Sequence, residues 1–166
     1  RAVNRLECVG ETLRYALNSL AVVAPEWLYT HSQVEWEKRY GRRVEDYRLP
    51  TRKEDRHAYA QVIGADGYAL LSAIYSLQAP AWLREVPAVE TLRRVWVQQF
   101  SLESGGVHGR TDKEGIPPSG LFISSPYDIE ARYGNKHTTS WVGYTVHVTE
   151  TCEDDAPHLI THVETT

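Results

Sequence analysis

The sequence predicts an α+β protein whose helices come first and whose strands come last. Over residues 2–24, apolar side chains recur every three or four positions, which places them on one face of a helix. Over residues 142–148, Val and Tyr alternate with Gly, Thr and His, which is the period of a strand. Gly and Pro are concentrated between these regions. We therefore expect a helical region at 1–100, a linker or long loop at 101–123, and a turn segment with a two-stranded hairpin at 124–166.

The first helix has a clear end, and shorter helices are expected after it. Pro25 ends the apolar pattern, because proline cannot continue a helix. The aromatic and charged stretch 26–40 predicts one or two short helices, which Gly41 stops. We expect the five Trp residues of the chain to anchor the core rather than to stack on bases.

A capping box marks the next helix. Thr51 and Glu54 have the spacing at which the Thr hydroxyl and the Glu side chain each accept from the other residue's amide. This pair predicts a helix over 52–63. Gly64-Ala65-Asp66-Gly67 interrupts the pattern, so a separate helix is expected to end near Leu77.

The remaining elements follow from proline and from apolar runs. Pro87 suits the first turn of a helix that continues to about Phe100. Residues 121–123 predict a short strand, and 158–164 predict the strand that returns to pair with 142–148. Because two strands alone are marginally stable in water, this hairpin needs a larger sheet.

Charge and composition limit the classes of function. The net charge of −4 is uneven, with 14 Lys and Arg against 12 Asp and Glu in residues 1–100, and 4 against 10 in residues 101–166. Any contact with DNA must therefore come from local patches. No apolar run approaches the length of a membrane span and no signal peptide is present, so we expect a cytoplasmic protein without a membrane partner. Cys8 and Cys152 are expected to be free thiols.

Two basic clusters are candidate DNA contacts. Lys38, Arg39, Arg42 and Arg43 form the denser one, and Arg and Lys supply the sequence-independent part of DNA binding. The alternative is a solvated helix end, where cations are favourable near the C-terminus. The second cluster, Arg132 and Lys136, lies in a stretch with Gly134 and Asn135 that has room to follow a backbone.

Neither a metal site nor a catalytic residue is expected in this chain. His158 and His162 are four residues apart, roughly 13 Å along a strand, so one ion cannot bridge them. The acidic stretch 153–155 is typical of a solvated turn. Asp128 and Glu130 have the spacing of some catalytic pairs, but Pro126-Tyr127-Asp128 is also ordinary turn chemistry.

Several ordered blocks of the chain resemble one protein family. They include Asn4-Arg5-Leu6-Glu7, Tyr40-Gly41-Arg42-Arg43-Val44-Glu45-Asp46-Tyr47-Arg48-Leu49-Pro50, Trp82-Leu83-Arg84-Glu85-Val86-Pro87, Pro126-Tyr127-Asp128-x-x-Ala131-Arg132-Tyr133, Trp141-Val142-Gly143-Tyr144-x-Val146-His147 and Pro157-His158-Leu159-Ile160-Thr161. Together they resemble DDE-type, RNase H-like transposases of bacterial insertion sequences. The likeness covers nearly the whole chain. One departure is Thr145, where the family commonly has Lys.

The resemblance implies a fold and a function. The helical region would be the insertion of an RNase H-like catalytic domain, and the hairpin would belong to its sheet. Such enzymes use three carboxylates to hold Mg²⁺ ions that cleave and transfer DNA strands at transposon ends. The resemblance places all three carboxylates outside this chain, so the fragment alone is expected to be inactive and to need no cofactor. The start at Arg1 and the lack of any Met suggest a chain cut at both ends.

Other interpretations remain open. The first is a non-catalytic helical module that binds DNA or a partner through residues 38–43. The second is a small metal-dependent hydrolase that uses the histidines and acidic residues of the C-terminal region. Whether the protein forms a homo-oligomer is also left open.

Overall fold

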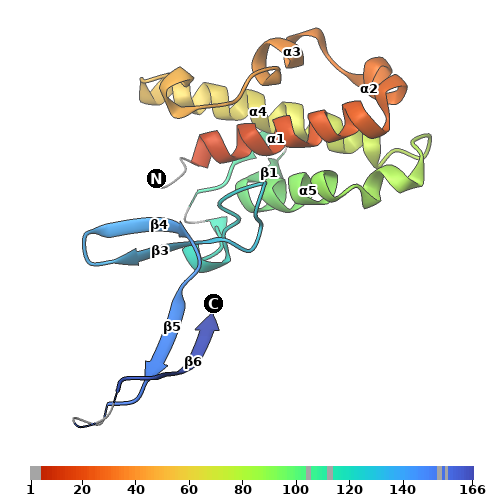
Figure 1. The fold of residues 1–166 in the computed structure, drawn as a ribbon. Coiled ribbons are helices and arrows are strands. Elements are labelled where there is room, and N and C mark those ends of the chain that lie inside the picture. The colour runs from red at the N-terminus through yellow and green to blue at the C-terminus, as the bar shows by residue number, and fades with distance from the viewer. Residues whose placement is uncertain (1–4, 104–105, 112–113, 153–154, 156) are drawn as a thin grey trace.

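Figure 1 shows that helices form the first part of the chain and strands the last part. The strands of the described residues pair as three β-hairpins. This computed structural model describes residues 5–103, 106–111, 114–152, 155 and 157–166. The predicted α+β class is confirmed. No helix in the described part of the chain is long and apolar enough to cross a membrane.

Three long helices enclose the core. They are α1 (Arg5–Val23), α4 (Lys53–Ile74) and α5 (Pro87–Gln99), and each packs against the other two. The apolar stripe predicted for the first helix is confirmed from Arg5 onward, because Leu6, Val9, Leu13 and Leu20 are buried and Leu17 is half-buried. Ala16, which the prediction did not include, is buried as well.

Two short helices cover one side of α1. They are α2 (Pro25–His31) and α3 (Val34–Tyr40), and they confirm the short helices expected at 26–40. Gly41 follows α3 and donates its N–H to the carbonyl of Glu37, so the predicted stop is also confirmed. The 3₁₀ turn η1 (Asp46–Arg48) then leads toward α4.

The predicted break at 64–67 is wrong, because α4 runs through it without interruption. A Cβ atom on Gly64 would lie 2.6 Å from Cε1 of Phe100, and one on Gly67 would lie 2.9 Å from Cδ1 of Trp96. Trp96 also donates from Nε1 to the carbonyl of Gly64, at 2.9 Å. The glycines thus let α5 and the start of β1 approach α4 closely, and tertiary packing outweighs their low helix propensity.

The predicted capping box at Thr51 and Glu54 is also wrong. The N-cap of α4 is Arg52, and no side chain caps the helix there. The helix starts one residue later than the pair requires, so the Thr51 hydroxyl is not in the capping position.

The range expected to be a linker contains a hairpin. Strand β1 (Phe100–Glu103) pairs antiparallel with β2 (Gly106–Gly109), and β2 packs against α4. The short turn η2 (Ala81–Glu85) precedes α5. The strand predicted at 121–123 is wrong, because residues 119–121 form the 3₁₀ turn η4 (Ser119–Leu121).

The side chain of Gln98, rather than a neighbouring strand, forms hydrogen bonds with the backbone of residues 121–123. Its Nε2 donates to the carbonyl of Leu121, and its Oε1 accepts from the amide of Ile123, both at 3.1 Å. This arrangement fixes the segment on α5 with Ile123 buried.

The last part of the chain forms two hairpins where one was expected. Strand β3 (Arg132–Lys136) pairs with β4 (Thr139–Gly143), and β5 (Val146–Glu150) pairs with β6 (Ile160–Thr165). The single strand predicted over 142–148 is divided because its partner changes: Gly143 pairs with Arg132, whereas Thr145 exchanges backbone hydrogen bonds with Thr166. The predicted return strand is confirmed as β6.

Strands β5 and β6 are exposed at every residue, and the hairpin that they form extends away from the helices in Figure 1. Val148 and Val163 lie opposite each other, and each keeps more than half of its surface exposed. The hairpin therefore presents apolar side chains that the described part of the chain does not cover.

We predict that Gly64→Ala destabilises the protein, although alanine favours helices. The added methyl group would overlap the Phe100 ring and approach Val107 Cγ1 within 2.9 Å, and overpacking of this kind costs about 1–3 kcal/mol against a propensity gain of about 1 kcal/mol. Urea unfolding of both proteins measures the difference. Gly120→Ala is the control, because a Cβ atom added to Gly120 would meet nothing within 4 Å. Equal stability of Gly64→Ala and the parent would contradict this account of the helix.

Candidate nucleic-acid interface

A pocket of about 520 Å³ lies between α3, the segment 42–49 and α4. Five cations and two carboxylates line it, and we call it the basic pocket. All four residues of the denser cluster predicted from the sequence meet here, together with Arg48, which the prediction missed. The cations are Lys38, Arg39, Arg42, Arg43 and Arg48, and the carboxylates are Glu35 and Glu45.

Arg39 serves as an anchor rather than as a free cation. It binds the carboxylate of Asp66 with two hydrogen bonds, from Nε at 2.8 Å and from Nη2 at 3.0 Å, and Asp66 is buried. The Tyr40 hydroxyl donates to the same carboxylate at 2.6 Å. Two-pronged arginine–carboxylate pairs are geometrically specific, so this contact fixes α3 on α4.

Burial acts in opposite directions on the pKa values of the two groups that bind Asp66. Burial raises the pKa of the Tyr40 hydroxyl, and its bond to Asp66 raises it further. Burial alone would lower the pKa of Arg39, but the hydrogen bonds to Asp66 and its negative charge outweigh burial and raise it. Both side chains therefore keep their protons at any ordinary pH, and the contact between α3 and α4 persists.

The other cations of the basic pocket differ in how they are neutralised. Lys38, Arg42 and Arg43 are exposed and have no ion pair or side-chain hydrogen bond with any residue that the structure describes. Arg48 lies 3.7 Å from Glu45 and also donates to the Tyr47 hydroxyl. These three charges outnumber the remaining carboxylate of the pocket, Glu35, so the concave surface should attract an anion.

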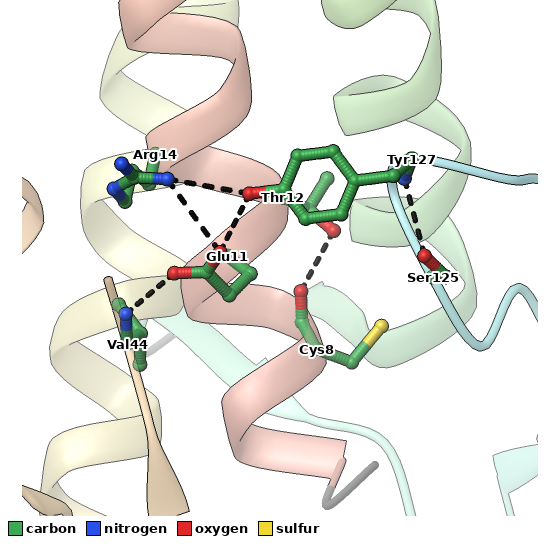
Figure 2. Close-up of polar contacts among 7 residues, drawn as sticks. All are labelled: Cys8, Glu11, Thr12, Arg14, Val44, Ser125 and Tyr127. Carbon is green, nitrogen blue, oxygen red and sulfur yellow. Dashed lines mark hydrogen bonds and ion pairs between the residues drawn. The ribbon is translucent and has the colours of Figure 1, made fainter.

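A buried carboxylate of α1 holds the backbone of this pocket in place. Glu11 accepts a hydrogen bond from the amide of Val44, a residue that lines the pocket (Figure 2). Gly10 allows the close approach, because a Cβ atom there would lie 2.8 Å from Cγ1 of Val44. The loop that contains Arg42 and Arg43 is thus fixed to the core of the helical region.

The same carboxylate also binds the turn segment. The Tyr127 hydroxyl donates to the other oxygen of Glu11 at 2.6 Å, and Arg14 lies 3.6 Å from that oxygen (Figure 2). Burial raises the pKa of Tyr127, and its bond to Glu11 adds to this effect. Glu11 therefore connects the basic pocket with the segment that leads into the last two hairpins.

The second predicted cluster lies apart from the basic pocket, on the β3–β4 hairpin. Arg132 is half-buried, and it donates to the backbone carbonyls of Ile129 and Ala131. Lys136 is exposed at the end of β3. Arg132 is thus engaged with its own turn, whereas Lys136 is accessible.

Asp128 has the turn role that its sequence context indicates. Its carboxylate accepts from the Tyr144 hydroxyl at 2.8 and 2.9 Å and from the backbone amides of Glu130 and Ala131. The bond from Tyr144, followed by these amides, lowers the pKa of Asp128. The side chain links the turn segment to the end of β4.

Among the described residues, no three His, Cys, Asp or Glu side chains lie close enough together to hold a metal ion. His158 lies 3.9 Å from Glu150, and His162 lies 4.0 Å from Glu164, all on exposed strand or turn positions. The residues 153–154 of the predicted acidic turn lie outside the described residues.

Cys8 is buried and Cys152 exposed, both as free thiols, as predicted. Burial raises the pKa of the Cys8 thiol to about 11, so it is not a nucleophile near neutral pH.

No protein-family model, no curated protein and no solved structure matches this chain. Arg48 could have been found from the sequence, since it lies in the same basic stretch, but the pairing of Arg39 with Asp66 joins two helices and leaves no local pattern.

Proposed function

We propose that this chain is an internal part of a DDE-type transposase of a bacterial insertion sequence, and that its helical region contacts the DNA backbone through the basic pocket. The observation that supports DNA contact is the group of three exposed cations, Lys38, Arg42 and Arg43, without carboxylate partners among the described residues. Lysine and arginine that neutralise phosphates release counterions, which favours binding without regard to base sequence.

The basic pocket favours contact with phosphates over reading of bases. Its cations come from α3 and from residues 42–48 that follow it, not from one long exposed helix face. Phosphate contacts position a protein on the duplex and carry no direct sequence information. We therefore expect weak discrimination between duplexes of different sequence.

The transposase assignment depends on the sequence resemblance, and two structural features are consistent with it. All residues of strands β5 and β6 are exposed, as expected for strands that belong to a larger, RNase H-like sheet. Asp128, the best candidate for a catalytic carboxylate here, is engaged in a turn. In this proposal Mg²⁺ is a cofactor of the intact enzyme in the bacterial cytoplasm, held by carboxylates that the resemblance maps outside residues 1–166.

A second candidate function is a helical module that binds DNA without catalysis. It is favoured by the composition of the basic pocket, whose lining residues all lie between 35 and 62. Strand cleavage by the longer protein that contains this sequence would favour the transposase, and DNA binding without cleavage would favour the module.

We predict that Arg42→Gln with Arg43→Gln weakens binding to a random 20-base-pair duplex roughly tenfold or more near 0.1 M salt, and lowers the slope of log K against log salt by about 2. Fluorescence anisotropy over a salt series measures both values. The matched control is Arg93→Gln with Arg94→Gln, an exposed arginine pair on α5 that lies outside the basic pocket. The proposal fails if the two double variants bind equally well.

We also predict that the purified chain does not nick supercoiled DNA in the presence of Mg²⁺ or Mn²⁺. A plasmid-relaxation assay resolved on a gel tests this expectation, with Asp128→Asn as the companion variant. Metal-dependent nicking that disappears in Asp128→Asn would refute the mapping of the catalytic carboxylates to other parts of the transposase.

A further inference from the structure

The outer edge of strand β6 is open to solvent. Among the described residues β6 pairs only with β5, and all six of its residues are exposed. Figure 1 shows that the hairpin of these two strands extends away from the helices, so this edge is accessible. The edge of a sheet presents a row of backbone N–H and C=O groups, and such a row is a template for pairing with a strand of another chain.

The β5–β6 ladder shows which residues of β6 direct their backbone groups toward the open edge. Thr145 and Thr166 exchange two backbone hydrogen bonds, at 2.7 and 2.9 Å, so they form a hydrogen-bonded pair. Pairs with and without hydrogen bonds alternate along an antiparallel ladder. His162 and Glu164 therefore direct their backbone groups toward β5, whereas Val163 between them directs its own outward.

Two copies of β6 fit together at this edge when a two-fold axis passes through Val163. In that antiparallel register, Val163 of one copy forms a hydrogen-bonded pair with Val163 of the second copy, and Thr165 lies opposite Thr161. His162 then lies opposite Glu164 of the second copy in a pair without backbone hydrogen bonds. The side chains of such pairs are the closest ones across two strands, with Cα atoms about 4.5 Å apart.

The side chains on the polar face favour this register. The imidazole of His162 can donate an N–H to a carboxylate in its neutral and in its charged form. Within one chain its Nε2 lies 4.0 Å from Glu164, which is too long for a hydrogen bond, and both side chains are more than half exposed. An axis through Glu164 would place two carboxylates opposite each other, whereas the axis through Val163 places a donor opposite an acceptor twice.

The other face of the hairpin is apolar and supports the same arrangement. Val146, Val148 and Val163 share this face, and each keeps more than half of its surface exposed. Pairing at β6 would place the two Val163 side chains on adjacent strands and join the apolar faces of both hairpins. Because two strands alone are marginally stable and three or more with an apolar face are stable, each hairpin would stabilise the other.

We propose that the outer edge of β6 is a dimerisation surface, to which a second copy of this chain adds its own β6 in antiparallel orientation. His162 of each copy would bind Glu164 of the other. The dimer should be weak and concentration-dependent, because one pair of short strands buries little surface. The outer edge of β5 stays available for the larger sheet that the proposed function expects, and the inference does not depend on DNA binding.

A symmetric cross-link tests the register. In the background Cys152→Ser, which removes the exposed native thiol, Val163→Cys should form a disulfide between two chains under mild oxidation. The Cα atoms of a hydrogen-bonded pair are about 5.5 Å apart, which suits a disulfide. Thr165→Cys is the matched control on the same face of β6, since its two copies would lie about 13 Å apart along the strands. We expect it to cross-link roughly tenfold more slowly or not at all.

Sedimentation equilibrium without DNA tests the side-chain pairs. The mass of the parent chain should rise with concentration from 18.9 kDa toward twice that value. His162→Glu should weaken association roughly tenfold, because two carboxylate pairs would face each other across the axis. His162→Glu with Glu164→His should restore it, since donor and acceptor only exchange places. His57→Glu, which makes the same change at an exposed site on α4, should have no effect, and urea midpoints confirm that each variant is folded.

Three results would overturn the inference. A parent chain that keeps the monomer mass at every concentration would leave the edge of β6 to another part of the longer protein. Equal cross-linking of Val163→Cys and Thr165→Cys would show association without this register. Failure of the exchanged pair to restore association would exclude the contact between His162 and Glu164. All three are separate from failure of the proposed function, which the arginine variants test by duplex binding.

Discussion

The carboxylate of Glu11 is the contact on which the arrangement of this protein depends. It lies buried on α1, and its two oxygens accept from parts of the chain that are far apart in sequence, the amide of Val44 and the hydroxyl of Tyr127. A buried charge is tolerated only when it is well paired, and here the partners are two donors and the nearby Arg14. One side chain thus positions both the loop that contains Arg42 and Arg43 and the turn segment that contains Tyr127.

The helical region separates structural cations from accessible ones. Arg39 is held by Asp66 and joins α3 to α4, whereas Arg42 and Arg43, only a few residues later, are exposed. The half-buried guanidinium of Arg39 is paired with a buried carboxylate, whereas the exposed guanidiniums of Arg42 and Arg43 remain available for a ligand. The paired Arg39 thereby holds α3 in place, while Arg42 and Arg43 beside it remain exposed.

The sequence predicted the helices well where an apolar stripe or a proline defined them, and poorly where packing between distant segments decided the structure. The stripe of α1 and the start of α5 at Pro87 depend on local pattern alone. The continuity of α4 through Gly64 depends on Phe100, and the division of the last strands depends on Thr145 pairing with Thr166. The same holds for the site: the basic cluster was visible in the sequence, but the role of Glu11 was not, because its partners Val44 and Tyr127 lie more than thirty positions away.

Replacing Glu11 with leucine tests most directly whether this side chain positions the loop that contains Arg42 and Arg43, through which we propose that the chain contacts DNA. Removing a negative charge would by itself strengthen DNA binding, as Glu26→Gln on exposed α2 should do. We predict instead that Glu11→Leu weakens duplex binding several-fold and lowers the unfolding free energy by about 1–3 kcal/mol, because the amide of Val44 loses its acceptor. Anisotropy and urea unfolding measure the two effects. Duplex affinity equal to or above that of Glu26→Gln, with unchanged stability, would contradict the account.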